Sequence, residues 1–432
     1  AIKLAATIAS LGVPILGTSA KNVDRAEDRE LFDRVLHKTK VPRAAGKTVF
    51  TTEEAIEAAH ELGYPVLVRP SYVLGGQGME IAWSDSDIVE FMDIINQIQQ
   101  DNPILVDKYI EGTEAEVDAI CDGTEILLPG IMEHIERTGI HSGDSISVYP
   151  APSLTAAQKA KMAEYSASLA KELGVVGLIN IQFIAKGDDI WVIEVNPRSS
   201  RTVPYLSKVT GVPIVQLATR CMLGEKLADM GWGTGLVKES PWYAVKMPVF
   251  SFEKLYGVET ALGPEMKSTG EALGIAKRWE DALYKGFRAS GIKLRPGKDG
   301  KGTVAVSLRE RDWEEGLPIV QKYAGAGFQI VATKGTCDFL NSRGVQAELI
   351  NRPGEESPNI IEALQKGMLT LVINTPTRGR DKSRSGFRIR RAAVEHNCAC
   401  LTSLDTAAAF ARCVERGLGQ VLEPVDIAHI FE

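Results

Sequence analysis

Residues 179–196 hold two apolar runs joined by a short polar turn, a pattern typical of a β-hairpin. Asn180 and Gln182 interrupt the first run at alternate positions, and Glu194 and Asn196 interrupt the second in the same way. Because side chains alternate between the two faces of a strand, pairing of Gln182 with Glu194 would place all four oxygen-bearing side chains on one face. The opposite face is then predicted to carry Ile181, Phe183, Trp191, Ile193 and Val195.

The polar face of this predicted hairpin has the composition of a metal site. Amide and carboxylate oxygens on a rigid sheet suit a hard cation such as Mg²⁺. Arg198 and Arg201 follow the second run directly, and guanidinium groups bind phosphate or carboxylate oxygens in a fork. A cation beside two such groups indicates phosphoryl transfer. The alternative is a half-exposed hairpin with a solvated polar face, which is the default for antiparallel strands.

A glycine-rich segment, residues 71–79, follows a short predicted strand that ends near Arg69. Gly75, Gly76 and Gly78 let the backbone approach a ligand closely and point N–H groups at it. The segment is not a Walker A loop, because no Gly-Lys-Ser/Thr follows. A mobile surface turn and a phosphate-binding lid are both open interpretations, and the position directly after a strand-borne arginine favours the lid.

Residues 114–118 alternate acidic and apolar side chains, which predicts a strand with one acidic face. One interpretation is a solvated edge strand. The other is a nucleotide contact, in which the backbone of residues 108–110 meets a base and Glu114 meets a ribose. A polar, glycine-containing loop follows at residues 139–145. A lone histidine is usually structural or exposed, so His141 by itself leaves its role open.

Size and composition bound the class of protein. A chain of 432 residues is long enough for about two to four domains. The net charge of −7 argues against general nucleic-acid binding, and no apolar run approaches the length of a membrane span. The 6 cysteines are scattered without metal-binding spacing, so we expect reduced thiols in a cytoplasmic protein. The sequence starts at Ala1, within an expected helix, and we expect a fragment of something longer.

Beyond a polar linker at residues 293–302, strands and helices alternate, which predicts a separate domain with a parallel sheet covered on both faces. Ligands of such sheets bind at the carboxyl ends of the strands. Residues 333–336 end one strand and open a helix, which favours anion binding, and Asn374 ends another strand. The next loop is either a solvated, mobile segment or a site for an anion such as phosphate. Its basic residues are Arg378, Arg380, Lys382, Arg384, Arg388, Arg390 and Arg391.

Three segments together resemble one enzyme family. Residues 67–80 look like the triphosphate lid in the ATP-grasp domains of carbamoyl phosphate synthetases, and residues 132–145 also match that family. Residues 193–205 are similar to its metal and phosphate signature. The combination is specific, and the resemblance covers essentially all of the chain.

The resemblance implies an architecture of mixed α/β and α+β class. An ATP-grasp fold would be followed by a doubly wound parallel-sheet domain like methylglyoxal synthase, which is regulatory in the family. Residues 1–20 would be a remnant of the preceding domain, 21–292 the ATP-grasp domain with a C-terminal extension, 293–302 the linker and 303–432 the allosteric domain. The chain therefore resembles the C-terminal portion of the large subunit.

Position in that subunit implies the second phosphorylation, in which carbamate and MgATP give carbamoyl phosphate and ADP. This is the last step of a synthesis from bicarbonate, glutamine-derived ammonia and ATP that feeds pyrimidine and arginine synthesis. The implied cofactors are ATP and two Mg²⁺ or Mn²⁺ ions per nucleotide. The implied partners are the missing N-terminal half, a glutaminase small subunit and a nucleotide effector such as UMP or IMP, with a homo-oligomer also possible.

The resemblance also implies residue roles. The metal ions would be bound by Gln182, Glu194 and Asn196, and carbamate and the moving phosphoryl group would be oriented by Arg198 and Arg201. The nucleotide would be held by Arg29, Arg69, Gly75, Gly76, Gly78, Lys108, Ile110, Glu114, Gly139, Ile140, His141, Ser142, Gln182 and Glu194. The effector would meet Thr333, Lys334, Thr336 and Asn374. Two alternatives stay open: a nucleotide-binding regulatory fragment that is inactive alone, and another ATP-grasp ligase that forms an acyl phosphate.

Overall fold

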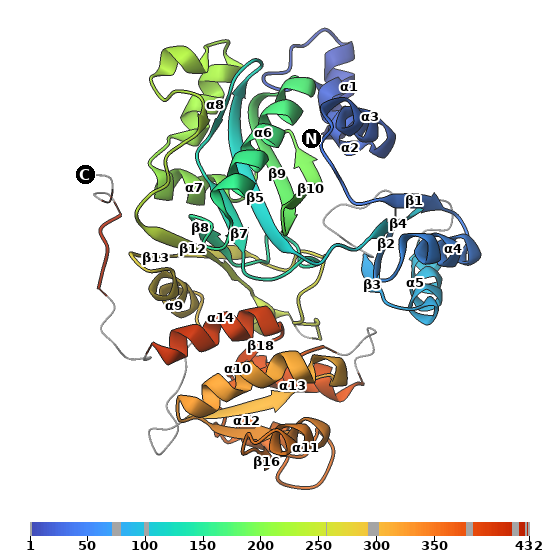
Figure 1. Cartoon of the computed structure of the whole chain (residues 1–432), viewed down its shortest axis with the longest axis vertical. Helices are drawn as coiled ribbons and strands as arrows, with labels where there is room; N and C mark the ends of the chain where they lie inside the picture. Colours follow the sequence, from blue (N-terminus) through green and yellow to red (C-terminus); the bar gives the residue numbers. More distant parts are fainter. Residues whose placement is uncertain are drawn as a thin grey trace.

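The computed structural model describes residues 2–70, 79–98, 103–255, 257–292, 302–376, 383–416, 423–427 and 430. Three sheets organise it, and Figure 1 shows the largest sheet in the upper part, a small antiparallel sheet to its right and a parallel sheet below. Three short helices precede them: α1 (Ile2–Ser10), α2 (Ala20–Glu27) and α3 (Arg29–Thr39).

The sequence predicts helical structure over residues 22–36, and the structure confirms it but divides the segment into two helices at Asp28. Asp28 has an extended backbone (φ −76°, ψ 126°) and ends α2 while it begins α3. Its carboxylate accepts a hydrogen bond from the Leu31 backbone N–H at 2.9 Å. Aspartate is a favourable N-cap for this reason. The division places Arg29 in the first turn of α3.

The small antiparallel sheet has the strand order β1-β4-β2-β3. Its strands are β1 (Gly46–Val49), β2 (Val66–Pro70), β3 (Glu80–Ala82) and β4 (Ile104–Lys108), and its helices are α4 (Thr52–Leu62) and α5 (Asp85–Ile98). Thr51 caps α4 and Gly63, with φ +75°, ends it. Ala59, Val68 and Met92 belong to a core of its own, so this subdomain packs as a unit.

The largest sheet has nine strands, and its main path runs β10-β9-β5-β7-β8-β12-β13, with β6 and β11 attached beside β5. Its strands are β5 (Thr113–Asp122), β6 (Ile126–Leu128), β7 (Ile131–His134), β8 (Ser147–Tyr149), β9 (Val176–Lys186), β10 (Asp189–Asn196), β11 (Gly235–Leu236), β12 (Tyr243–Val249) and β13 (Gly270–Ala276). The helices of this region are α6 (Ala156–Glu172), α7 (Val203–Thr210), α8 (Ile214–Met222) and α9 (Trp279–Ala289). Short 3-10 turns lie at Leu227–Met230 and Phe252–Lys254.

Helices cover the two faces of this sheet unequally. On one face α3 and α6 pack against the side chains of β5, β9 and β10, and Phe183 and Leu169 are fully buried there. On the other face α7 and α8 cover Ile120 and Leu178. Burial of each large side chain contributes about 1.5–3 kcal/mol. Farther along β9, Asn180 and Gln182 share the face of Leu178, so the polar row lies next to α7 and α8.

The C-terminal region contains a five-stranded sheet in which all neighbours are parallel, in the order β16-β15-β14-β17-β18. The strands are β14 (Thr303–Ser307), β15 (Gln329–Ala332), β16 (Glu348–Leu349), β17 (Leu371–Asn374) and β18 (Ala399–Leu401). The helices are α10 (Trp313–Gly325), α11 (Lys334–Ser342), α12 (Ile360–Gln365), α13 (Ser385–Glu395) and α14 (Leu404–Glu415), after a 3-10 turn at Glu310–Asp312. Apolar side chains pack against both faces of the sheet, which confirms the predicted doubly covered parallel sheet.

The C-terminal region packs directly on the largest sheet. One apolar cluster continues from Val245 and Phe287 into Phe410 and Val306, and the rings of Phe287 and Phe410 meet edge to face with centroids 4.6 Å apart. α14 therefore lies against α9 (Figure 1). Apart from Gly302, the predicted linker lies outside the described residues.

Candidate functional site

The paired strands β9 and β10 have the register that the sequence predicts. Gln182 lies opposite Glu194, and Asn180 lies opposite Asn196. A β-bulge interrupts the pairing at Ile193, because Val192 and Glu194 pair with consecutive residues of β9. The four polar side chains therefore share one end of the hairpin.

The bulge corrects part of the predicted apolar face. The residues that are buried as predicted are Ile181, Phe183 and Val195. On the other side of the bulge, Val192 lies opposite Phe183 and is buried. Trp191 is only half-buried, and Ile193 is 41% exposed. An inserted residue reverses which side chains face the core, so the predictions for Trp191 and Ile193 were wrong.

The three predicted metal ligands differ in exposure and in hydrogen-bond partners. Glu194 is exposed, Gln182 is half-buried and Asn196 is buried. Gln182 donates from Nε2 to Ser142 Oγ at 3.1 Å, which leaves its amide oxygen for another ligand. Asn196 Oδ1 accepts a hydrogen bond from Arg198 Nη2 at 3.0 Å, and a carbonyl oxygen has a second lone pair.

This donor set fits a hard divalent cation, because carboxylate and amide oxygens are its preferred ligands. Within the described ranges, no group of three or more His, Cys, Asp or Glu side chains could hold a metal ion. The row contains a single carboxylate, Glu194, so the amide oxygens and a ligand's phosphates would have to complete the coordination of Mg²⁺.

Arg198 and Arg201 lie just beyond the end of β10, and both are exposed. Arg201 reaches segment 266–268, where its Nη1 lies 3.3 Å from the sulfur of Met266. Two exposed guanidinium groups beside an exposed carboxylate can receive an anionic ligand. Sequence reasoning missed a neighbour, Glu27 of α2. Burial raises the pKa of Glu27, while the positive charge of Arg198 opposes that shift.

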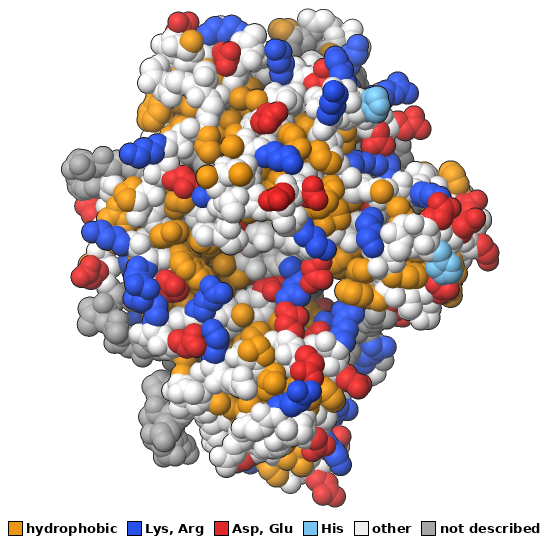
Figure 2. All heavy atoms as spheres, in the orientation of Figure 1, with side chains coloured by type: hydrophobic (Ala, Val, Ile, Leu, Met, Phe, Trp, Pro, Cys, Tyr) orange, Lys and Arg blue, Asp and Glu red, His pale blue; other side chains and the backbone are white. Residues whose placement is uncertain are grey.

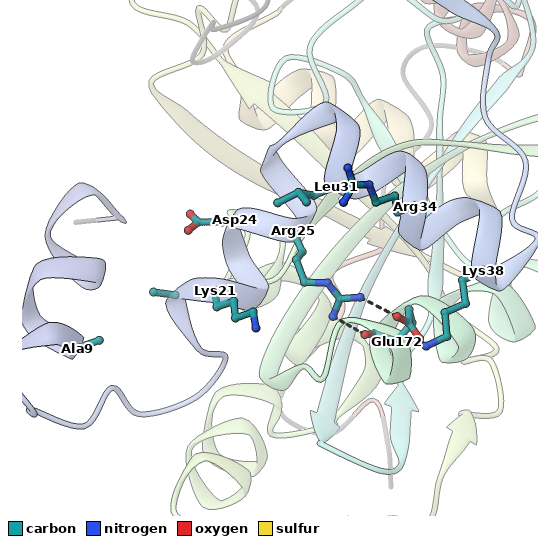
Figure 3. A pocket seen from close by; sticks show the side chains of 9 residues that line it. Ala9, Lys21, Asp24, Arg25, Leu31, Arg34, Lys38 and Glu172 are labelled. Carbon is teal, nitrogen blue, oxygen red and sulfur yellow. Dashed lines mark hydrogen bonds and ion pairs between the residues drawn. The ribbon is translucent and has the colours of Figure 1, made fainter.

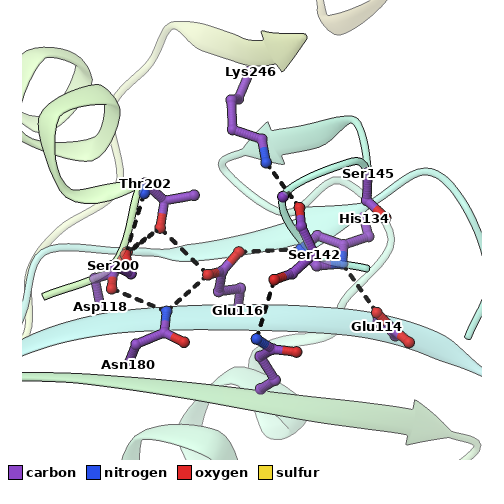
Figure 4. Close-up of polar contacts among 12 residues, drawn as sticks. Glu114, Glu116, Asp118, His134, Ser142, Ser145, Asn180, Ser200, Thr202 and Lys246 are labelled. Carbon is purple, nitrogen blue, oxygen red and sulfur yellow. Dashed lines mark hydrogen bonds and ion pairs between the residues drawn. The ribbon is translucent and has the colours of Figure 1, made fainter. Parts of the chain in front are cut away.

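A buried acidic cluster lies next to the polar row (Figure 4). Glu114, Glu116 and Asp118 of β5 are all buried, because β5 lies between β9 and β7 inside the sheet. The solvated edge-strand interpretation is therefore wrong. Asn180 donates from Nδ2 to Glu116 Oε1 at 2.7 Å and to Asp118 Oδ1 at 3.0 Å. The Thr202 hydroxyl donates to Asp118.

His134 of β7 connects two of these carboxylates. Its Nδ1 lies 3.1 Å from Glu114 Oε2, and its Nε2 lies 3.3 Å from Glu116 Oε2. Burial lowers the pKa of His134, but the hydrogen bonds to both carboxylates outweigh burial and raise it to about 9. Burial raises the pKa of Glu116, yet the His134 imidazolium prevails and holds it below its ordinary value. Burial and the charge of Glu116 raise the pKa of Asp118.

This cluster predicts a pH dependence of stability. The folded pKa of His134, about 9, lies above the unfolded value of 6.5, so its stabilisation is complete below pH 6.5 and is lost as the pH rises through 9. The contribution is about 3 kcal/mol at most. Urea unfolding at pH 7 and pH 10 measures it, with His134→Gln as the control. We expect the natural chain to lose more stability than the variant, and equal losses in both would contradict the assignment.

Two arginines predicted to hold a triphosphate are brought together by one carboxylate. Arg29 Nη2 donates to Asp107 Oδ1 at 2.9 Å, and Arg69 Nε donates to Asp107 Oδ2 at 3.1 Å. Arg29 Nη1 is buried without a hydrogen-bond partner, an arrangement that suits an anionic ligand. Asp107 was not predicted, although it lies in β4 directly before Lys108. The predicted glycines Gly75, Gly76 and Gly78 lie outside the described residues.

The remaining predicted nucleotide contacts lie where the small antiparallel sheet meets the largest sheet, from the end of β4 onward. The Lys108 and Tyr109 backbone N–H groups donate to Ala45 O and Pro65 O, and Ile110 O accepts from Thr138 Oγ1 at 2.7 Å. The predicted contacts in the following loop are Gly139, Ile140, His141 and Ser142. His141 Nδ1 accepts a hydrogen bond from the Gly143 N–H at 3.0 Å, and burial lowers the pKa of His141. This imidazole is therefore neutral near pH 7.

A separate hollow of about 630 Å³ opens between α1, α2, α3 and α6 (Figure 3). It is lined by Ala9, Ala20, Lys21, Asp24, Arg25, Leu31, Arg34, Lys38 and Glu172. Glu172 pairs with Arg25 and Lys38 at 2.7 and 2.6 Å. The polar row of β9 and β10 does not line it, so we do not connect this hollow with the candidate site.

The predicted effector residues meet at the carboxyl ends of β14, β15 and β17. Thr333 Oγ1 donates to Ser307 Oγ at 3.1 Å at the start of α11, where Lys334 is the first residue. Thr336 Oγ1 accepts from the Leu308 N–H at 3.1 Å. Asn374 donates to Ser307 O at 3.0 Å. The structure thus gathers Thr333, Thr336 and Asn374 around one strand end.

Two family models match the chain. The ATP-binding domain of the carbamoyl-phosphate synthase L chain matches residues 28–230, and the MGS-like domain matches residues 315–402. The large chain of carbamoyl phosphate synthase from Lachnoclostridium phytofermentans is 57% identical over 430 residues, and that from Agathobacter rectalis is 56% identical over 431 residues. The chain belongs to the carbamoyl-phosphate synthase large-chain family. Each alignment covers 100% of this chain but 40% of the relative.

Solved structures show that the region before the MGS-like domain of this carbamoyl-phosphate synthase family member has the ATP-grasp fold. The biotin carboxylase domain of Hydrogenobacter thermophilus 2-oxoglutarate carboxylase aligns with a TM-score of 0.54 at 22% identity, over 67% of this chain and 70% of that one. An N5-carboxyaminoimidazole ribonucleotide synthetase aligns with a TM-score of 0.52 at 19% identity, over 66% and 76%. Together with the MGS-like family match and the parallel C-terminal sheet, these alignments confirm the expected fold classes of both regions.

The surface of this family member carries mixed charge. Figure 2 shows acidic and basic side chains interspersed over the face viewed, without a continuous patch of one sign. In the part of the chain that the structure describes, no helix has the length and apolar character needed to cross a bilayer.

Proposed function

We propose that this chain binds ATP with two Mg²⁺ or Mn²⁺ ions and phosphorylates carbamate, giving carbamoyl phosphate and ADP. The observation that carries the proposal is the register of β9 and β10, which places Gln182 opposite Glu194 with Asn196 on the same face. Membership of the carbamoyl-phosphate synthase family supports the ATP-dependent reaction class. The pathways supplied would be those of pyrimidine and arginine, in the cytoplasm.

Residues of the hairpin would divide the work between cation and anion. Gln182, Glu194 and Asn196 would hold the metal ions, which neutralise phosphate charge when bound. Arg198 and Arg201 would orient carbamate against the phosphoryl group, because two exposed guanidinium groups lie directly beyond the carboxylate. Catalysis of this kind is mainly positioning and charge stabilisation.

The nucleotide would lie between the small antiparallel sheet and the largest sheet. Arg29 and Arg69, held by Asp107, would meet its phosphates together with the predicted lid at Gly75, Gly76 and Gly78. The base and ribose would be met by Lys108, Ile110 and Glu114, with Gly139, Ile140, His141 and Ser142 lining the site. Glu114 is 6% exposed and lies beside His134. The Glu114 carboxylate would therefore bind a ribose hydroxyl and the His134 imidazolium at the same time.

The proposed partners follow from the part of the family that the chain represents. Since the chain spans about 40% of the length of the curated relatives it matches, we propose that an N-terminal half and a glutaminase small subunit supply carbamate precursors. We propose no nucleic-acid or membrane partner. A homo-oligomer of this chain stays open as a further partner.

The same length supports a second candidate, a regulatory fragment that binds nucleotide without turnover. A third is a different ATP-grasp ligase. ATP hydrolysis measured with ammonium carbamate, with bicarbonate and with amino acids separates the three. We expect stimulation by freshly dissolved carbamate alone. Stimulation by another acid would favour the third candidate, and binding of MgATP without turnover would favour the second.

We also propose that the MGS-like domain binds a nucleotide effector at Thr333, Lys334, Thr336 and Asn374. Arg390 links this site to the catalytic region, because its Nη1 donates to Asn374 Oδ1 at 2.6 Å and its Nε donates to Glu259 Oε1 at 2.8 Å. Arg390 is 3% exposed. An ion pair that spans two regions, with its arginine buried and its carboxylate partly exposed, can differ between two conformational states of the protein.

Glu259→Gln is therefore expected to weaken the effect of UMP or IMP on turnover by at least about threefold, within the usual range of coupling energies. UMP binding and unstimulated turnover should stay within about threefold, since Glu259 touches neither proposed site directly. Titrations of turnover and of calorimetric UMP binding measure the two quantities. Glu395→Gln, which removes an exposed partner of Arg391 on the same helix, is the matched control. Equal effector responses in both variants would contradict this link.

A further inference from the structure

Lys246 of β12 is a buried lysine with no role in the reaction as proposed so far. It is 1% exposed and lies between Ser147 of β8 and Leu273 of β13 in the sheet. Burial of an ammonium group costs several kcal/mol unless its charge and its N–H donors find partners. Among the described residues, no carboxylate oxygen lies within 4.0 Å of Lys246 Nζ, the limit for an ion pair. An apolar side chain would fill this position at lower cost.

The ammonium group is instead directed at the nucleotide loop. Lys246 Nζ donates to the carbonyl oxygen of Ser142 at 2.9 Å, and Figure 4 shows the side chain reaching from its strand toward that residue. The charge also acts on nearby groups from neighbouring elements. Burial raises the pKa of Glu271 on β13, and the charge of Lys246 opposes that shift. The same charge adds to the effect of His134, which holds the pKa of Glu116 on β5 below its ordinary value against burial. It adds to the lowering of the His141 pKa by burial.

Ser142 connects Lys246 to the polar row of the hairpin. Its hydroxyl oxygen accepts the hydrogen bond from Gln182 Nε2 at 3.1 Å, while its carbonyl receives Lys246. One residue is thus held from β12 on one side and from β9 on the other. The donor half of the Gln182 amide is occupied by Ser142, which directs the other half, the oxygen, away from that contact.

We propose that Lys246 is a positioning residue for the metal site. Its ammonium group fixes Ser142, and Ser142 fixes the orientation of the Gln182 amide so that Oε1 is available to a divalent cation. This inference rests on the proposed binding of MgATP. Outer groups that orient ligands in this way typically change metal affinity by about 10–100-fold.

Calorimetric titration of the full chain with ADP, in Mg²⁺ and in EDTA, tests the inference without a measurement of turnover. Lys246→Met keeps the length of the side chain and removes the donor. We expect it to weaken MgADP binding at least about tenfold, with metal-free ADP binding within about threefold of the natural chain. If only the Mg²⁺-dependent part of the ADP affinity is lost, Lys246 positions the metal site; a general loosening of the fold would weaken ADP binding in EDTA as well.

Ser142→Ala provides a second variant that buries no unpaired charge. It should lose the same gain in ADP affinity that Mg²⁺ gives the natural chain. If Lys246→Met does not fold, Ser142→Ala still tests the second step, the contact between the Ser142 hydroxyl and Gln182. Retention of the full gain by a folded Lys246→Met or by Ser142→Ala would overturn the inference, as would an equal loss of both affinities. A natural chain that binds neither form of ADP would overturn the proposed function, and this inference with it.

Discussion

Replacing Glu194 with alanine is expected to reduce ATP formation from MgADP and carbamoyl phosphate by at least about a hundredfold, the scale found when one group that stabilises transition-state charge is removed. Glu194 is the single carboxylate of the proposed metal row, and it lies opposite Gln182. The remaining amide oxygens carry no net charge to offset a divalent cation. The initial rate of ATP formation in a coupled assay measures the change.

The matched control for this variant is Asp189→Ala. Asp189 is an exposed carboxylate on the same strand, at the turn end of the hairpin opposite Lys186. We expect its rate to stay within about twofold of the natural chain, because single surface substitutions away from a site have small effects. Comparable losses in both variants would indicate damage to the hairpin, and an unchanged rate in Glu194→Ala would contradict the metal assignment.

Arg198→Met is expected to lower the rate at saturating MgADP by at least about a hundredfold, while ADP affinity stays within about threefold. The guanidinium group is exposed beyond the end of β10 and donates to Asn196 Oδ1 at 3.0 Å. It would therefore act on the anion that exchanges the phosphoryl group rather than on the adenosine. An interaction realised mainly in the transition state lowers the rate constant more than the affinity.

Steady-state rates and calorimetric ADP binding, measured on the same preparation, separate these two effects. Arg220→Met serves as the control, since Arg220 is a partly exposed surface arginine of α8 paired with Glu225 at 2.6 Å. A fall in ADP affinity as large as the fall in rate would show that Arg198 binds the nucleotide instead. Full activity in Arg198→Met would contradict any role of Arg198 in the reaction.

The sequence was most informative where local periodicity and burial agree. The polar row of β9 and β10 was predictable, because a slip of one residue would have turned Gln182 toward the apolar face. The bulge at Ile193 was not, since an inserted residue leaves no mark on the composition of the strand. The same limit applies to Asp28, whose capping role interrupts a continuous helical pattern of charge.

Residues that depend on distant pairing were the ones missed. The acids of β5 are equally consistent with a solvated edge strand, and only the position of β5 between β9 and β7 buries them and makes Glu114 and Glu116 partners of His134. Asp107 and Lys246 lie on separate strands far from the hairpin in sequence, and their contacts arise from the packing of the sheets. The short strand β18 (Ala399–Leu401) was also missed, because three residues carry too little pattern.

The central claim is that the hairpin and the arginines beyond it transfer a phosphoryl group between ADP and carbamate. Incubation of the natural chain with MgADP and carbamoyl phosphate tests it most directly, because carbamoyl phosphate is supplied directly and no carbamate has to be generated. The account predicts ATP formation that requires both substrates and Mg²⁺ and that falls at least about a hundredfold in Glu194→Ala. A chain that binds MgADP in calorimetry yet forms no ATP at any concentration of carbamoyl phosphate would contradict it.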